Sequence, residues 1–202
     1  MLDALTAWVG EGGYFAVAFL MFLENVVPPI PSEVIMPLAG YAASRGDLSL
    51  PLAILAGSAG SLAGAWLWYG IGRWIGAERL ERGAARYGRW LTLSPLDVRR
   101  AIGWFDRFGG ATVLVGRLVP AVRTLISVPA GIVRMPTGRF LLFSTIGTLI
   151  WTSVLAGLGY LLGGQYEAIE GWLDPVSKGI VAMLVLGYLW RVATFRPGRE
   201  PG

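Results

Sequence analysis

Long stretches without charge dominate the pattern of hydrophobic and polar positions along the chain. Residues 50–72 span 23 positions and residues 140–165 span 26 positions with no charged side chain. About 20 helical residues cross the hydrocarbon core of a bilayer, so these stretches predict transmembrane helices over 50–72 and 140–163. A shorter apolar stretch at 176–192 predicts a third span, provided that Lys178 near its start reaches the interface.

Two other apolar segments, 13–45 and 108–135, are interrupted by prolines. The prolines at the interruptions are Pro28, Pro29 and Pro31 in the first segment and Pro120 and Pro129 in the second. Proline removes a backbone donor and clashes with the preceding turn, so a helix cannot continue through such a cluster. Lipid offers no replacement hydrogen bonds, and the interruption must therefore lie within protein or line a cavity. We expect both segments to form re-entrant helical hairpins that turn at these prolines.

The two interrupted segments look like copies of one another. Each consists of two apolar stretches separated by prolines with charged residues beside them, then a run of small residues and then a long span. The second copy lies about 90 residues after the first. Repeats of this kind build many secondary transporters. The pattern predicts an all-α integral membrane protein with a single membrane domain, 1–202, built from an inverted repeat over 13–72 and 108–165. Each repeat is a re-entrant hairpin followed by a transmembrane helix, and a C-terminal transmembrane helix is added.

Arginines collect between the apolar stretches, and their distribution predicts the orientation in the membrane. Residues 73–107 contain eight arginines, and others lie before the second span and in the C-terminal tail. Short basic segments stay in the cytoplasm, so we expect the N-terminus outside, the C-terminus inside and the two repeats in opposite orientations. Within this linker, arginines recur every three or four residues from Arg79 to Arg89, which predicts an amphipathic helix lying on lipid headgroups.

Composition narrows the class of function further. Charged residues make up 15% of the chain, against about 25% in soluble domains. The net charge of +4 does not indicate nucleic-acid binding, because the arginines alternate with apolar spans instead of forming one basic surface. The chain has no cysteine and no histidine, which removes disulfides, thiolate metal sites and the commonest general base. We therefore expect no enzymatic activity, no cofactor and no metal, while a homo-oligomer is compatible with the sequence.

Four charged residues fall inside the predicted hairpins: Glu24, Glu33, Arg117 and Arg123. A charge near the bilayer centre costs at least ~2.5 kcal/mol, so such residues are candidates for function. The planar guanidinium of arginine matches a phosphate group, and the half-helix N-termini after each break also favour an anion. Burial favours the protonated form of a carboxyl group and a neighbouring arginine favours its charged form, so the two acids can take up and release protons.

Together these side chains predict a site for an anionic lipid headgroup coupled to protons. Arg117, Arg123 and Ser127 are the expected phosphate ligands, and Glu24 and Glu33 are the expected proton carriers. An alternative is that the four charges form buried ion pairs that only lock the hairpins together. For Ser127, local capping of the broken helix is an equal alternative to headgroup contact.

At these residues the sequence resembles the DedA family of bacterial membrane proteins, within the superfamily that carries the VTT domain. The matching motifs lie at residues 24–40, 68–73, 105–109 and 116–131. The best match reads Gly-Arg-Leu-Val-Pro-Ala-Val-Arg at 116–123, and the resemblance covers residues 10–165, most of the chain.

The resemblance implies a lipid transporter with two facing re-entrant hairpins, similar to eukaryotic lipid scramblases that share the domain. Members are implicated in moving undecaprenyl phosphate, or phospholipids such as phosphatidylethanolamine, between leaflets of the bacterial cytoplasmic membrane, in dependence on the proton motive force. Two acidic positions and two arginines are essential in the family. They correspond here to Glu24 and Glu33 and to Arg117 and Arg123, although some members place an aspartate later in the first hairpin.

The leading hypothesis is therefore a proton-coupled transporter of a lipid phosphate, best represented by undecaprenyl phosphate. A phospholipid flippase or scramblase would use the same phosphate contacts, and a scramblase would not need the acids to titrate. An ion or proton antiporter would affect lipids only indirectly. A hydrolase of lipid phosphates has less support without His, Cys or a metal cluster in the sequence, although Glu24 and Glu33 together could hold Mg²⁺ weakly.

Overall fold

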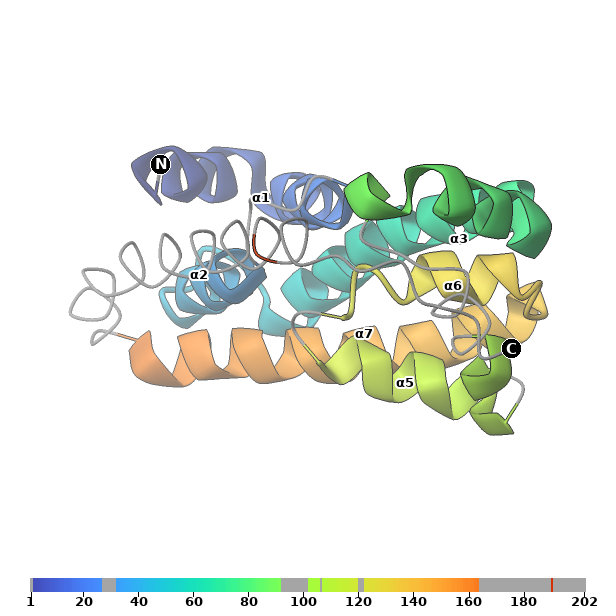
Figure 1. The fold of residues 1–202 in the computed structure, drawn as a ribbon. Helices are drawn as coiled ribbons and strands as arrows, with labels where there is room; N and C mark the ends of the chain where they lie inside the picture. The colour runs from blue at the N-terminus through green and yellow to red at the C-terminus, as the bar shows by residue number, and fades with distance from the viewer. Residues whose placement is uncertain are drawn as a thin grey trace.

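The computed structural model describes residues 2–26, 32–91, 102–105, 107–119, 122–163 and 190, with side chains from residue 12 onward except those of 80–91. Within these ranges the regular elements are helices, so the expected all-α class is confirmed (Figure 1). They are α1 (Leu2–Val26), α2 (Ser32–Ser44), α3 (Leu50–Leu91), α5 (Gly110–Leu118), α6 (Ser127–Ile132) and α7 (Thr137–Leu162).

Helices α3 and α7 contain the two predicted spans. The segments Leu50–Arg79 and Thr137–Leu162 are long and apolar enough to cross a membrane, and Gly12–Val26 is a shorter apolar helix. Helix α3 extends as far as Leu91, but its backbone turns at Gly76, where φ is 69, and the part beyond the turn runs in a different direction from the first span (Figure 1). The predicted C-terminal span at 176–192 lies outside the described residues, except for Trp190.

The two faces of α7 have the composition of a helix that meets lipid on its outer side. Its buried face carries mostly small and hydroxyl-bearing residues, namely Phe140, Ser144, Gly147, Thr148, Thr152, Ala156 and Gly159. Its exposed face carries large apolar residues, among them Leu142, Ile146, Ile150, Val154 and Leu158. A helix of a soluble protein places its apolar stripe toward the core instead. Small residues inside and apolar residues outside are typical of helices packed within a bilayer.

In each interrupted segment, one short helix packs on α3 and the other packs on α7. We call this the exchanged arrangement. The first helix of each interrupted segment lies on the span that follows it, α1 on α3 and α5 on α7. The second helix crosses to the other span, α2 to α7 and α6 to α3 (Figure 1). The two interrupted segments therefore make equivalent contacts, each with both long helices.

Where α2 crosses α7 and α6 crosses α3, glycines allow the two helix backbones to touch. A Cβ atom at Gly40 of α2 would stand 2.0 Å from the carbonyl oxygen of Ala156 in α7, and one at Gly159 would stand 2.0 Å from that of Pro37. At the other crossing, a Cβ atom at Gly131 of α6 would stand 2.1 Å from the carbonyl oxygen of Tyr69 in α3. The small residues that follow each proline break, which include Gly40 and Gly131, thus lie where two helices cross.

The helix ends agree with the predicted interruptions as far as these are described. Helix α1 ends at Val26 and α2 begins at Ser32, on either side of the first proline cluster. The prolines of that cluster, and Pro120 in the second segment, lie outside the described residues. Pro129 occupies the first turn of α6, where backbone N–H groups have no partner within the helix. That both segments are re-entrant stays a prediction.

The close crossing of α6 and α3 predicts that Gly131→Ala destabilises the protein. The added methyl group meets the Tyr69 carbonyl oxygen and must separate the helices, at a cost of about 1–3 kcal/mol. The control is Gly138→Ala, because no atom lies within 4 Å of that position. Thermal unfolding in detergent micelles compares the two, and equal stabilities would contradict this packing.

Candidate functional site

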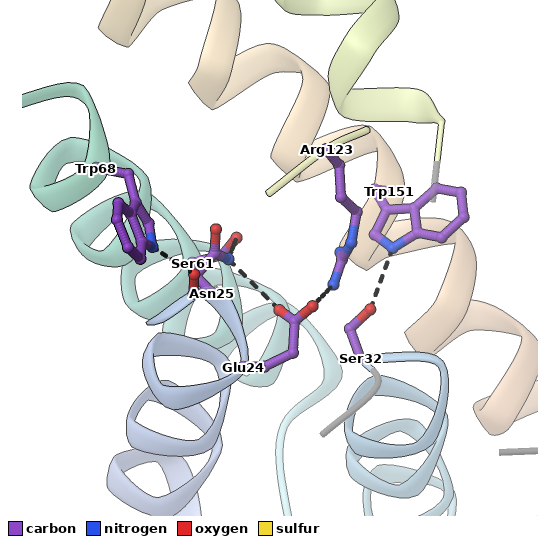
Figure 2. Close-up of polar contacts among 7 residues, drawn as sticks. All are labelled: Glu24, Asn25, Ser32, Ser61, Trp68, Arg123 and Trp151. Atoms are coloured by element: carbon purple, nitrogen blue, oxygen red, sulfur yellow. Dashed lines mark hydrogen bonds and ion pairs between the residues drawn. The ribbon is translucent and has the colours of Figure 1, made fainter. Parts of the chain in front are cut away.

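An ion pair between Glu24 and Arg123 forms the centre of the candidate site. The Glu24 side chain lies near the end of α1, and Arg123 lies in the turns between α5 and α6, 99 residues away in sequence. Both residues are buried, each with 5% of its surface exposed, and an Nη2 group of Arg123 donates to the carboxylate (Figure 2). Two of the predicted site residues, one from each interrupted segment, are thereby in direct contact.

Asn25 fixes the end of α1 against α3. Its side-chain nitrogen donates to Ser61 Oγ at 2.8 Å and lies 3.4 Å from the second carboxylate oxygen of Glu24 (Figure 2). The indole nitrogen of Trp68 donates to the backbone carbonyl of Asn25 at 2.9 Å. That carbonyl lies in the last turn of α1, where helical carbonyls have no partner within the helix. The carboxylate is therefore held by its neighbours in a defined position.

Trp151 of α7 connects Arg123 with the start of α2. The guanidinium carbon of Arg123 lies 5.6 Å from the centre of the Trp151 ring, within the range of cation–π attraction. The indole nitrogen of Trp151 donates to Ser32 Oγ at 3.4 Å (Figure 2). Trp151 lies within an uncharged predicted span, and in the fold it contacts the buried charges.

Arg117 is the second buried arginine, and it has no ion pair with any described residue. It lies in the last turn of α5 with 3% of its surface exposed, and its Nη2 group donates to Ser127 Oγ at 2.8 Å. Its Nε atom has no hydrogen-bond partner among the residues that the structure describes. A Cβ atom at Gly147 would stand 2.7 Å from the Cβ atom of Arg117, so this side chain begins directly against α7. A buried cation with a free donor suits an external anion.

Two buried hydroxyl groups of α7 also lack a hydrogen-bond partner within the described part of the chain. They belong to Ser144 and Thr148, which flank Gly147 on the buried face of the helix. Thr152, one turn further, bonds Ser58 at 2.8 Å and the Thr148 carbonyl at 2.9 Å. An unpaired buried polar group costs about 1–3 kcal/mol, so the two free hydroxyls need an explanation. The four-residue spacing of these hydroxyls within an uncharged span was the signal in the sequence, and the sequence analysis missed it.

Glu33 makes no direct contact with the other predicted site residues, although it lies close enough to Glu24 for their charges to interact. It lies in the first turn of α2, is half-buried and makes no hydrogen bond or ion pair with any described residue. The structure thus brings Glu24 together with Arg123 and Arg117 together with Ser127. The role of Glu33 in proton transfer stays a prediction.

Comparison with known proteins places this chain in a family. The model of the VTT domain matches residues 30–161, which include both arginines and most of the described helices. The chain belongs to the VTT/DedA family of membrane proteins. The expected family resemblance is therefore confirmed.

Relatives of this VTT-family protein cover most of its length. A Lactococcus lactis protein named alkaline phosphatase-like protein is 43% identical over 94% of this chain and 91% of its own. Undecaprenyl phosphate transporter A of Staphylococcus aureus is 33% identical, with 94% of each chain covered. Uncharacterized membrane protein YkoX of Bacillus subtilis is 38% identical over 86% of this chain and 78% of its own. No solved structure matches the chain.

The buried ion pair predicts strong coupling between Glu24 and Arg123 in stability. Glu24→Gln leaves the guanidinium buried without a counter-charge, and we expect a loss of about 3–5 kcal/mol in the free energy of unfolding. The double variant with Arg123→Gln should regain most of that loss, because neither charge remains. Denaturant unfolding of both single variants and the double variant in micelles measures the coupling.

The exposed pair of Arg45 and Asp47 provides a matched control. Its Nε–Oδ2 distance is 3.8 Å and both side chains are 61% exposed, so Asp47→Asn should cost less than ~1 kcal/mol. If Glu24→Gln cost no more than this substitution, the assignment of a strong buried pair would be wrong.

Proposed function

We propose that this protein moves an anionic lipid phosphate, with undecaprenyl phosphate as the best candidate, across the bacterial cytoplasmic membrane. The observation that carries the proposal is Arg117, a buried arginine with a free Nε donor and no carboxylate partner among the described residues. The relative named undecaprenyl phosphate transporter A supports the choice of lipid.

The charge of the buried cluster favours an anionic ligand. The fully buried members are one carboxylate, Glu24, and two guanidinium groups, Arg117 and Arg123, so these three side chains sum to a charge of +1, while the half-buried Glu33 interacts with Glu24 only at longer range. An arginine that is buried without compensation is costly, and a phosphate group neutralises it while accepting from its planar donors. The lipid tail is too apolar to enter this site and stays in the bilayer.

The free hydroxyl groups of α7 complete the proposed phosphate site. Ser144 and Thr148 lie on the helix face against which Arg117 packs, and neither hydroxyl has a hydrogen-bond partner in the described ranges. Two hydroxyl donors and one guanidinium donor match three phosphate oxygens. Ser127 then acts through Arg117, whose guanidinium it holds at 2.8 Å, and does not itself contact the phosphate.

Proton coupling follows from the shared use of Arg123. A phosphate that contacts Arg123 competes with Glu24 for the same guanidinium. A buried carboxylate that loses its cation favours the protonated state, so headgroup binding and proton uptake occur together. Glu33, which has no partner among the described residues, serves as a second proton carrier on the way to solvent.

The proposed movement uses two re-entrant hairpins of opposite orientation, with the N-terminus outside and the C-terminus in the cytoplasm. The equivalent contacts of the two interrupted segments with α3 and α7 support this internal symmetry. Rocking of one repeat against the other would expose the charge cluster to each side of the membrane in turn.

Transport by purified protein in proteoliposomes tests the proposal. We expect labelled undecaprenyl phosphate to cross faster when a proton gradient is imposed, and transport to fall to background in Arg117→Ala because the phosphate loses its free cation. The control Arg139→Ala removes the same charge from an exposed position of α7 and should transport normally. Unchanged transport by Arg117→Ala would exclude this site, and transport indifferent to the gradient would favour a scramblase.

Substitution of the free hydroxyls separates substrate contact from stability. Thr148→Val removes a hydroxyl that no described residue uses, so the unfolding temperature should be unchanged or higher. Affinity for undecaprenyl phosphate should fall about tenfold, the worth of one hydrogen bond to a charged group. The control Thr152→Val breaks the bond to Ser58 and should lower stability with little effect on affinity. The reverse pattern would place the headgroup elsewhere.

A further inference from the structure

The end of α6 adopts a backbone conformation that normally requires glycine. Arg134 has φ 52, and its N–H donates to the Gly131 carbonyl at 2.9 Å, while the N–H of Met135 donates to the Ala130 carbonyl at 3.1 Å. This pair of bonds is the Schellman motif, in which the residue with positive φ is usually glycine. Throughout the described part of the chain, every other residue with positive φ is a glycine. The arginine is therefore kept at a conformational cost.

Arg134 faces a recess of about 560 Å³ between α3 and the end of α6. Arg79 lines the same recess, and it is fixed there because Nη1 donates to the Trp74 carbonyl at 3.1 Å and the guanidinium lies 5.7 Å from the Trp74 ring centre. Glu78 also lines the recess and has a partner of its own within the chain. The recess therefore presents two guanidinium groups to a ligand.

An apolar groove begins on the other side of Trp74. It has a volume of about 530 Å³ and runs along the outer face of α3, between Ala63 and Trp74, with Phe22 of α1 as part of its wall. From Ala63 to Trp74 the helix rises by about 16 Å. Gly70 lies within the groove, and no atom stands within 4 Å of a Cβ atom at this position. Trp74 thus separates an apolar channel from a basic recess.

We propose that these two hollows form a binding site for an anionic glycerophospholipid, separate from the buried charge cluster. Arg134 and Arg79 bind the headgroup phosphate, and one acyl chain lies in the groove along α3. Three observations select this ligand. The groove lies on a bilayer-facing helix. The basic recess lies at the end of this groove, where Trp74 is 76% exposed. Tryptophan and arginine at the end of a membrane helix are typical of the level of the lipid headgroups. A zwitterionic lipid would bring a second cation toward the two arginines, so a net negative headgroup is preferred.

The backbone of Arg134 makes an unusually clear test possible. Arg134→Gly relieves the positive φ and removes the charge together, so the variant should unfold at a higher temperature in nanodiscs of pure phosphatidylcholine. In the wild type, added phosphatidylglycerol should raise the unfolding temperature. In Arg134→Gly this stabilisation should weaken, with the concentration of phosphatidylglycerol for half the effect about fivefold higher.

Two further variants separate charge from backbone conformation. Arg134→Lys retains a cation at the strained position and should keep most of the response to phosphatidylglycerol. Arg139→Ala removes a nearby exposed arginine that does not line the recess and should respond like the wild type. Phosphatidylglycerol with brominated acyl chains should quench the fluorescence of wild-type protein more than that of Trp74→Phe. Equal responses of wild type and Arg134→Gly, or no preference of the wild type for phosphatidylglycerol over phosphatidylcholine, would overturn the proposal.

Discussion

The ion pair between Glu24 and Arg123 is the contact on which the arrangement of the buried site depends. It joins the end of α1 to the turns before α6, two places where the helical backbone is interrupted. A buried pair of this kind contributes little net stability, because both charges lose their hydration, yet removal of one partner leaves an uncompensated charge. Such a contact fixes the relative positions of the two segments, and each charged group can still accept a different partner. A ligand that offers either group a new partner can therefore change the arrangement.

The helix crossings around this pair are close contacts between small residues. Contacts made by glycine against backbone carbonyls, as at Gly40, Gly131 and Gly159, involve few interlocking side chains. In a bilayer there is no hydrophobic gain from bringing helices together, so close packing of small residues supplies the attraction. Such contacts bring the helix backbones close together. The exchanged arrangement, with each short helix pair on both long helices, would transmit a shift in one segment to the other.

Features of the sequence that reflect exposure to lipid were predictable, and features that depend on tertiary contact were not. The spans at α3 and α7 follow from charge-free stretches, and the burial of Glu24, Arg117 and Arg123 follows from their position inside apolar segments. No local pattern distinguishes Arg123, which has a carboxylate partner, from Arg117, whose only hydrogen-bond partner among the described residues is Ser127. The free hydroxyls of Ser144 and Thr148 required the packing of α5 on α7 to become apparent. The strain at Arg134 is a property of backbone dihedrals and leaves no mark in composition.

The unequal surroundings of the two buried arginines suggest an order of events for the proposed transport. Arg117 has a free Nε donor, whereas Arg123 is already engaged by Glu24 and by the face of Trp151. An incoming phosphate therefore meets Arg117 first and gains Arg123 only by displacing the carboxylate. The first step needs no proton, and the second makes protonation of Glu24 favourable because the acid would otherwise be buried as an unpaired anion. Two equivalent arginines would bind the headgroup in one step and leave the carboxylate uninvolved. The difference between Arg117 and Arg123 would thus connect recognition of the lipid to the movement of a proton.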